Sequence, residues 1–351
     1  MPINTNLTPR DVPWDVTADH LTTQYKSFYL SFDDNSFGYV QFAYGNLGLF
    51  IKVSPLGWTY YPSPEEAPNE PIIGSSTHLF RSMKISKDRF KVTVSGNDFN
   101  IDPEAKKCHV TIKGLYDLHI EMEGEGYQVK DFGRTSKVEF MRHRTFPMNK
   151  VTGTVTAYGK TKKVTGNAVA VDAMFFRDKF TSFGHTWQNA MLFDREQKHV
   201  LTCLHYYTRD QPMSAARSPS QASLTLDGKL VSVMLDNEYY QDECHSPDGL
   251  RYELPKTVRR VLSGKTFDGR SVQVKLRAEL ETIGSITDVL KIFPKWAKDL
   301  VSIWAGLPYV FVWLQNMAAD VYIDGKHECQ LSGAGYVEQT CVHYPPSESE
   351  K

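Results

Sequence analysis

The chain has 351 residues, 41% of them hydrophobic, and its 40 Lys and Arg residues nearly balance 41 Asp and Glu residues, which leaves a formal net charge of -1. Phosphate contact needs a clear positive excess, so nucleic acid is excluded as an expected partner. Five widely spaced cysteines without a C-x-x-C pair predict reduced thiols, with neither a disulfide framework nor a metal site.

Residues 1–20 contain Pro2, Pro9 and Pro13 but no apolar run, which predicts a flexible tail and no secretory signal. No apolar stretch later in the chain is long enough to span a bilayer. We therefore expect a soluble, cytoplasmic protein.

Tight turns between alternating apolar and polar residues dominate the rest of the chain. Three Asp-Gly turns, at 227–228, 268–269 and 324–325, supply the positive φ angles of β-hairpins, and residues 33–36 separate two further strand-like stretches. The length is about twice that of a usual domain. The pattern predicts an all-β protein with two consecutive antiparallel barrels, the first over residues 21–180 and the second over 181–345.

Candidate binding residues occur in both lobes. Arg142 and His143 are set among aromatic residues before a long predicted strand, where they could hold a polar head group or transfer a proton. The alternative is that Arg142 faces solvent and His143 bonds to a backbone carbonyl. His185 and Trp187 begin the second lobe, either at a cavity mouth or as a cap on its first strand.

His205 is predicted to share a strand face with Cys203 and Tyr207. A Cys-His pair can be nucleophilic, but the same spacing is typical of a barrel wall, and a structural or pocket-lining role is favoured. Asp172 and Glu238 lie within strand patterns, and no partner in the sequence gives either an acid or base role. The signatures of common hydrolases, kinases and dehydrogenases are missing, so neither a cofactor nor a catalytic residue is predicted.

Residues 286–304 show apolar side chains at spacings of three and four, which predicts one amphipathic helix near the C-terminus. Its aromatic and aliphatic side chains suit either packing against a barrel or docking on a membrane surface as a lid. The candidates for the membrane or lid role are Phe293, Trp296, Leu300 and Trp304.

The chain resembles the fungal survival factor 1 family of two-barrel, lipocalin-like proteins. The resemblance covers most of the length after about Thr22 and depends on the order and spacing of several segments. These include Asn46-Leu47-Gly48-Leu49, Met141-Arg142-His143, Val151-Thr152-Gly153-Thr154-Val155, Trp187 and the turn at residues 262–269.

The resemblance implies a protein of cell survival under oxidative stress that carries ceramide, or another long-chain sphingolipid, between endoplasmic reticulum and Golgi membranes. Such a carrier is expected to shelter its ligand in an apolar barrel interior. Two departures stand out: Asp172 occupies the place of a family histidine, and prolines interrupt the N-terminus that docks on membranes in family members.

Two alternatives remain at this point. Related two-barrel proteins are hydratases and cyclases, which suggests an enzyme in which Asp172 or Glu238 protonates an isoprenoid or polyene while Arg142 or His143 orients a carbonyl. A stress-response scaffold with solid barrels is the weaker alternative.

Overall fold

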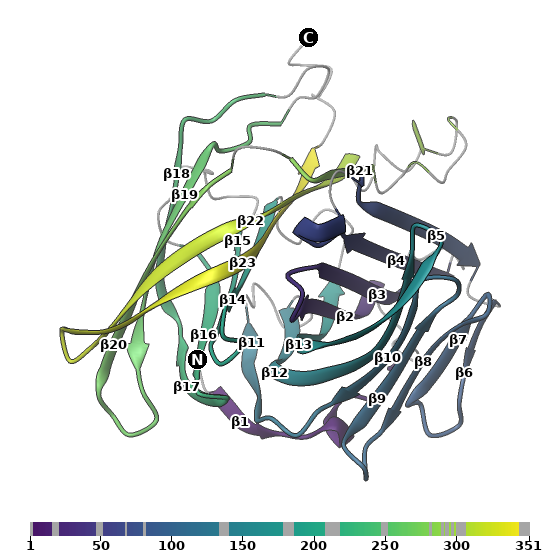
Figure 1. The fold of residues 1–351 in the computed structure, drawn as a ribbon, viewed down its shortest axis with the longest axis horizontal. Coiled ribbons are helices and arrows are strands. Elements are labelled where there is room, and N and C mark those ends of the chain that lie inside the picture. Colours follow the sequence, from purple (N-terminus) through teal and green to yellow (C-terminus); the bar gives the residue numbers. More distant parts are fainter. Residues whose placement is uncertain are drawn as a thin grey trace. The chain divides into compact units, whose positions relative to one another are not determined.

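The computed structural model describes residues 3–15, 21–46, 52–66, 69–79, 82–132, 140–177, 186–207, 218–246, 252–280, 283–288, 291, 295, 298–299 and 307–343. The chain divides into two compact units, Met1–Asp178 and Lys179–Lys351. Each is built almost entirely of antiparallel strands (Figure 1). This architecture confirms the predicted all-β class with two consecutive barrels.

The first unit contains β1 to β13 and two short 3-10 helices. Its strands follow the order β5-β4-β3-β2-β13-β12-β10-β9-β8-β7-β6, with β11 on β12 and β1 on β11. The elements are β1 (Ile3–Leu7), η1 (Pro9–Asp11), β2 (Leu21–Phe32), β3 (Phe37–Asn46), β4 (Lys52–Tyr61), η2 (Pro64–Glu66), β5 (Ile72–Leu79), β6 (Met83–Ile85), β7 (Lys91–Val94), β8 (Asn97–Asp102), β9 (Lys107–Ile112), β10 (Tyr116–Glu121), β11 (Gly126–Phe132), β12 (Phe140–Ala157) and β13 (Lys160–Arg177).

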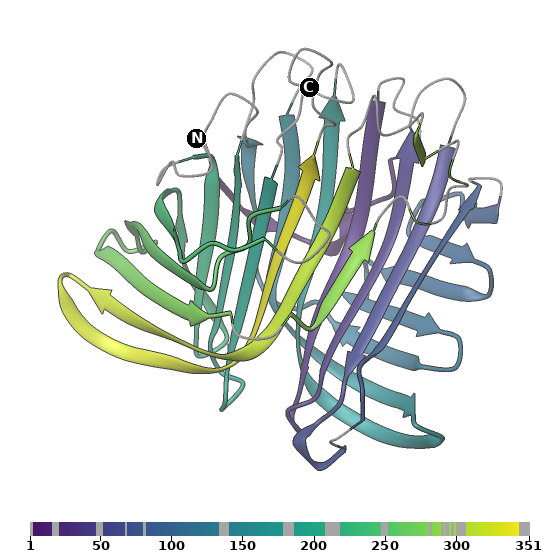
Figure 2. The same cartoon turned by 90° about the horizontal axis from the view of Figure 1, so that it is seen from above.

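The second unit contains β14 to β23 in the order β17-β16-β15-β14-β23-β22-β20-β19-β18, with β21 on β22. The long hairpin of β22 and β23 curves strongly (Figure 2). The elements are β14 (Thr186–Asp194), β15 (Val200–Tyr207), β16 (Ser220–Leu226), β17 (Lys229–Met234), β18 (Asp236–Asp242), β19 (Thr257–Lys265), β20 (Ser271–Glu279), β21 (Ser285–Asp288), β22 (Leu307–Ile323) and β23 (Lys326–His343).

The predicted Asp-Gly turns are all hairpin turns in the structure. Asp227 and Gly228 have φ angles of 48° and 75°, and Asp324 and Gly325 have φ angles of 49° and 76°. Two consecutive residues with positive φ match the right-handed twist of the strands they join, and Asp and Gly tolerate that conformation. These turns connect β16 to β17 and β22 to β23 and so fix the register of the second sheet.

A bulge at Pro147 divides β12 between two partners. The first part of β12 pairs with β11 and the last part with β10, and the register shifts between Phe146 and Asn149. Pro147 has no N–H to donate, and the Asn149 amide donates instead to the carbonyls of Phe146 and Ala168, at 2.9 Å each. The bulge therefore lets one strand of 18 residues serve two parts of the first barrel.

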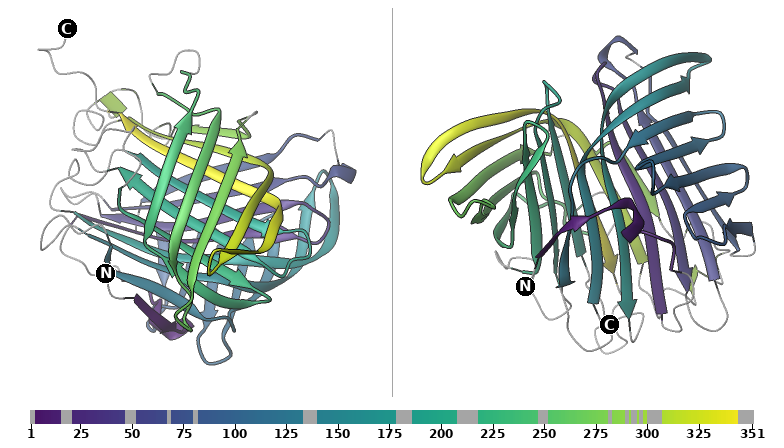
Figure 3. Two further views of the ribbon diagram at one scale, coloured as in Figure 1. Left: turned by 90° about the vertical axis from the view of Figure 1, so that its left-hand side faces the viewer. Right: turned by 90° about the horizontal axis from the view of Figure 1, so that it is seen from below.

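The ends of the second sheet meet and close its barrel. Ser232 of β17 forms a bridge with Thr266, just after β19, and the Ser232 hydroxyl donates to the carbonyl of Lys265 at 2.8 Å. The left panel of Figure 3 looks onto β18, β19 and β20, which lie side by side in this wall. Apolar residues from both walls, such as Leu201, Val274 and Trp313, form one continuous core.

Two expectations from the sequence need correction. Residues 3–7, expected in a free tail, form β1 against β11, and Trp14 is fully buried in the core of the first barrel. Residues 285–288, where the amphipathic helix was expected to begin, form β21 because their backbone pairs with β22. Lys295, Lys298 and Asp299 are helical, whereas Phe293, Trp296, Leu300 and Trp304 lie outside the described residues. Among the described helical residues, no segment is long and apolar enough to cross a bilayer.

Candidate functional site inside the second barrel

A row of polar side chains from β14, β15, β16, β18, β19 and β23 lines part of the inside of the second barrel. Because side chains alternate across a strand, the face of β19 that buries Val258 and Leu262 in the core also carries Arg260. Strand register places Gln188 opposite both His205 and Gln339, His205 opposite Ser220, and Tyr239 opposite Arg260. We call this set the polar belt: Gln188, His205, Ser220, Tyr239, Arg260 and Gln339.

Arg260 is the unusual member of the belt. Its side chain is buried, with the residue 2% exposed, and its guanidinium carbon lies 5.0 Å from the centre of the Tyr239 ring. Its three guanidinium nitrogens have no oxygen or nitrogen hydrogen-bond partner, and no described carboxylate forms an ion pair with it. Arginine stays protonated in proteins, so the belt holds a positive charge that no described negative group balances.

The Cys203 thiol lies beside this charge but does not neutralise it. Burial raises the pKa of Cys203 above its usual value, although Arg260 acts in the opposite direction. The sulfur therefore remains a neutral thiol at neutral pH, which also argues against a nucleophilic Cys203–His205 pair.

His205 is neutral as well. Burial, followed by the nearby Arg260 charge, lowers the pKa of His205 to about 3. Ser218 donates its hydroxyl proton to the carbonyl of Tyr206 at 2.6 Å, so the His205 Nε2–H donates to Ser218 Oγ at 2.9 Å. The His205 ring packs against Tyr207 and Tyr239, with centroids 4.8 and 4.9 Å away. Burial raises the pKa values of both tyrosines, so both keep their hydroxyl protons.

Amides complete the belt on the side away from Arg260. Gln188 donates to the Gln339 Oε1 atom at 2.8 Å, and Gln339 donates to the carbonyl of Glu253 at 3.2 Å. Both glutamines are buried, and the Gln188 Oε1 atom has no hydrogen-bond partner. The belt thus combines a cation, several donors and one open acceptor.

The space beside Arg260 is small. A cavity of about 10 Å³ is lined by residues that include Cys203, His205, Ser220, Tyr239 and Arg260. This is about the volume that one water molecule needs. The sequence led us to expect a ready-made apolar hollow, but at this position side chains fill the barrel.

The other predicted site residues do not gather around the belt. Tyr207 faces inward beside His205, whereas Trp187 lies on the outer face of β14, opposite to Gln188, and is half-buried. His185 lies outside the described residues. Arg142 and His143 belong to the first unit, and they point to opposite faces of β12, so they cannot act as a pair. The binding roles of these residues remain predictions.

The first barrel buries a different set of charges, around Asp172. The Asp172 carboxylate accepts from Lys26 at 2.5 Å, from Gln24 at 2.9 Å and from Arg144 at 3.2 Å. Burial acts to raise the pKa of Asp172, but Lys26, Arg144 and Arg142 outweigh it and hold the pKa below its usual value. Asp172 is therefore ionised, and it has no proton to donate to an alkene.

Residues of the expected tail complete this network. Lys26 also donates to the carbonyl of Val12 at 2.7 Å, and its ammonium lies 5.1 Å from the centre of the Trp14 ring. Arg142 lies 3.9 Å from Asp15. His143, on the other face of β12, is buried, and burial lowers its pKa to about 4. Residues 12–15 thus cover the charged part of the first barrel's interior.

Sequence reasoning missed Arg260, although the signal was present. In the sequence, Arg259 and Arg260 look like two adjacent surface charges. Arg260, however, lies two positions from both Val258 and Leu262, so it points to the same face of the strand as these apolar residues. Arg259 does face outward, where its Nε donates to Asp242 at 2.6 Å. Glu238, the other candidate acid, lies on the face of β18 opposite to Tyr239 and accepts from Tyr240 at 2.9 Å.

The fold is shared with solved structures of distant sequence. A putative AttH protein from Nitrosomonas europaea has a TM-score of 0.58 and 12% identity, with 98% of this chain and 99% of that chain covered. Kievitone hydratase from Nectria haematococca has a TM-score of 0.58 and 13% identity, with 97% and 94% covered. At such low identity these similarities establish the lipocalin-like fold alone.

Sequence comparison identifies closer relatives. Survival factor 2 of Schizosaccharomyces pombe is 59% identical over 336 residues, which cover 96% of this chain and 94% of the relative. The ceramide-binding protein SVF1 homologue of Emericella nidulans is 21% identical, with 96% and 90% covered, and that of Debaryomyces hansenii is 26% identical, with 58% and 51% covered. The Svf1 family profile matches residues 3–343. The chain therefore belongs to the Svf1 family.

Proposed function

We propose that this protein binds a long-chain lipid, ceramide or another sphingolipid, and carries it between membranes without changing it chemically. In this proposal it works in the cytoplasm, makes peripheral contact with endoplasmic reticulum and Golgi membranes, and supports survival under oxidative stress. The relatives in Emericella nidulans and Debaryomyces hansenii are named ceramide-binding proteins, and the relative in Schizosaccharomyces pombe is named a survival factor.

The observation that carries the proposal is the division of the second barrel into a polar belt and an apolar interior. Beyond the belt, inward residues such as Leu192, Leu201 and Leu224 form an apolar core, with a few polar residues, such as Ser232 and Asn237, among them. A lipid has the same division into a polar head and an apolar tail. Each buried methylene contributes about 0.8 kcal/mol, so a long chain binds strongly once it enters such an interior.

Entry of a lipid requires the barrel to open. The cavity of about 10 Å³ beside Arg260 cannot hold a hydrocarbon chain, so the aromatic side chains around it must move apart. Tyr207 and Tyr239 contact His205 through their rings, and an aromatic contact of this kind contributes only about 0.5–1.5 kcal/mol.

The enzymatic alternative finds no acid in the two carboxylates considered for it. Asp172 is ionised between Lys26 and Arg144, and Glu238 faces away from the barrel interior. The hydratase fold is shared only at 13% identity, which carries no chemistry. Carrier function therefore remains the better-supported proposal.

The proposal is tested by purifying the full chain from fungal cells, extracting it with organic solvent and identifying the lipids by mass spectrometry. We expect a sphingolipid near one molecule per chain. The same protein should accelerate the transfer of fluorescent ceramide from donor to acceptor liposomes, and heat-denatured protein serves as the control. A protein that arrives without lipid and leaves the transfer rate at the control level would contradict the proposal.

A further inference from the structure

Arg260 is surrounded by an aromatic ring and neutral polar groups, but no described negative charge lies beside it. A buried guanidinium without a counter-charge costs several kcal/mol, and an anionic ligand beside it would offset that cost. The guanidinium lies over the Tyr239 ring in a cation–π contact, and Arg260, whose three side-chain nitrogens have no oxygen or nitrogen partner, lines the cavity.

Among the described residues, the titratable side chains on the inward face around Arg260 are neutral. His205 carries no charge, the Cys203 thiol keeps its proton, and Tyr207 and Tyr239 remain protonated hydroxyl donors. Glu238, the acidic residue nearest in register, lies opposite Val261 and borders the cavity, but its side chain belongs to the face of β18 opposite to Tyr239. Asp242 pairs with Arg259 on the outer face of the wall. The belt therefore presents one cation and several hydrogen-bond donors, which is the complement of an anionic oxygen cluster.

We infer that Arg260 binds an acidic lipid head group, so that the second barrel takes a long-chain lipid that carries a phosphate or a carboxylate. This inference rests on the proposed lipid-binding function and refines its ligand class. A guanidinium can donate two parallel hydrogen bonds to either group, whereas the neutral head of an unmodified ceramide leaves the charge unbalanced.

The test is an uptake assay with the full chain. The protein is incubated with phosphatidylcholine vesicles that contain ceramide, ceramide 1-phosphate or palmitate, then separated from them, and the bound lipid is measured by mass spectrometry. We expect at least about tenfold more uptake of an acidic lipid than of ceramide, as the loss of a charged hydrogen-bond partner predicts. The phosphate and carboxylate arms distinguish the two head groups.

Two neighbouring arginines provide the matched variants. Arg260→Met is expected to remove the preference for acidic lipids, while Arg259→Met, which changes the outward arginine, is expected to keep it. Circular dichroism and a thermal melt establish that each variant is folded. If wild type takes up ceramide as well as the acidic lipids, or if Arg260→Met keeps the preference, the inference is wrong while lipid binding stands. If wild type takes up no lipid, the proposed function itself fails.

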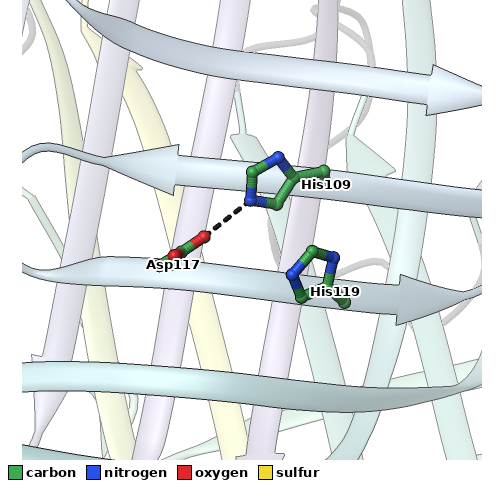
Figure 4. A group of neighbouring side chains, drawn as sticks. All are labelled: His109, Asp117 and His119. Carbon is green, nitrogen blue, oxygen red and sulfur yellow. Dashed lines mark hydrogen bonds and ion pairs between the residues drawn. The ribbon is translucent and has the colours of Figure 1, made fainter.

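An independent cluster of ligand-type side chains lies on the outer face of the first barrel. His109 of β9 and His119 of β10 are directly opposite in register, and Asp117 lies two residues before His119 on the same face of β10 (Figure 4). The His109 Nε2 atom is 2.6 Å from the Asp117 carboxylate, and the two imidazole rings stack with centroids 4.5 Å apart. One donor atom from each residue lies within 4.8 Å of the others.

This arrangement fits a divalent transition-metal ion. Two imidazole nitrogens and a carboxylate oxygen are a common ligand set for zinc, and ligands bound at about 2.0–2.1 Å lie about 3.4 Å apart. Side-chain rotations of an ångström or so bring the three atoms to that spacing, while the paired strands hold the backbone. We propose a surface site for Zn²⁺ formed by His109, Asp117 and His119. The sequence did not indicate it, because the prediction of no metal site considered only cysteine motifs.

Isothermal titration of the full chain with zinc sulfate tests this site. We expect one Zn²⁺ per chain, and His119→Ala or Asp117→Asn should weaken the affinity at least about tenfold because a ligand is lost. His327→Ala is the control, since this exposed histidine lies near Asp320 but is outside the cluster. Wild-type affinity in the His119→Ala variant would overturn the proposal, as would a loss of binding in His327→Ala alone.

Discussion

In the first barrel the buried ammonium of Lys26 meets the Asp172 carboxylate at 2.5 Å, whereas in the second barrel the buried guanidinium of Arg260 meets an aromatic ring and a neutral thiol. Both cations lie on inward faces of strands and next to apolar core residues. The first is balanced within the chain, and a segment near the N-terminus covers it. The second has no carboxylate partner among the described residues. This contrast separates a charge that supports the fold from one that is available to a ligand.

The largest effect is expected from removing the Asp172 carboxylate, which balances the buried cations of the first barrel. Asp172→Asn leaves Lys26 and Arg144 without their carboxylate, and we expect the free energy of unfolding to fall by about 3–5 kcal/mol. Urea unfolding, followed by circular dichroism, measures the loss, and hydrogen exchange in β2 and β13 locates it. Asp320→Asn is the control, because this side chain is 40% exposed on the outer face of β22. A stability equal to that of the control would show that the network contributes nothing.

Removing the Trp14 side chain, which covers the buried charges of the first barrel, should have the next largest effect. Trp14→Ala deletes a fully buried indole and its contact with the Lys26 ammonium, which we expect to cost about 3 kcal/mol. The loss is at the low end for a tryptophan because a segment near the terminus can detach without opening the sheet. Trp14→Phe should recover most of it. Hydrogen exchange confined to β2 and β13 is the expected pattern, and faster exchange in β14 to β16 would contradict it.

Acid should weaken both barrels, each through a buried histidine. His143 and His205 have pKa values of about 4 and about 3 in the folded protein, against 6.5 as the reference value. A lowered histidine pKa means that the unfolded chain takes up the proton first, so stability is full above pH 6.5 and falls as the pH drops towards 4. Between pH 7.5 and 5.0 each histidine should remove about 2 kcal/mol.

Urea unfolding at the two pH values checks this prediction. His143→Asn should abolish the loss of stability that acid causes in the first barrel, and His205→Asn should abolish the loss in the second. His327→Asn, at an exposed position, is the control. Asp172 adds to the acid sensitivity only below about pH 3.8, because its lowered pKa keeps it ionised above that value. An unchanged pH dependence in both buried-histidine variants would exclude this mechanism.

The smallest effect on stability is expected from removing Arg260, the buried cation without a carboxylate partner. Arg260→Met removes the desolvation cost but also a cation–π contact, so we expect the free energy of unfolding to stay within about 1 kcal/mol of wild type or to rise slightly. The comparison with Asp172→Asn in the same urea assay is decisive. If Arg260→Met unfolds the second barrel, Arg260 is a structural charge like Lys26, and the contrast between the barrels disappears.

Much of the fold was predictable from local patterns. The Asp-Gly turns and the alternation of apolar and polar residues, as in β20, predicted antiparallel hairpins, and the structure confirms them. The apolar spacing after Ile286 misled us, since residues 285–288 pair with β22. A short segment takes the conformation that satisfies its backbone hydrogen bonds, and a neighbouring strand edge is invisible in local periodicity.

The candidate site was less predictable. His205 and Tyr207 were identified from their parity on one strand, and Arg260 could have been found in the same way. Alternation along one strand cannot predict that β15 and β19 face each other. That proximity requires the barrel to close through Ser232 and Thr266. The same holds for Asp172 and Lys26, which are 146 residues apart in sequence.

The sequence by itself determined the β class, the hairpin turns and the face on which each side chain lies, because these follow from the two-residue repeat of a strand and the φ angles of turn residues. Only the tertiary structure decided which inward charges found partners. Ion pairing depends on distances of a few ångströms between strands remote in the chain, and those distances are set when each sheet curls on itself and packs its core.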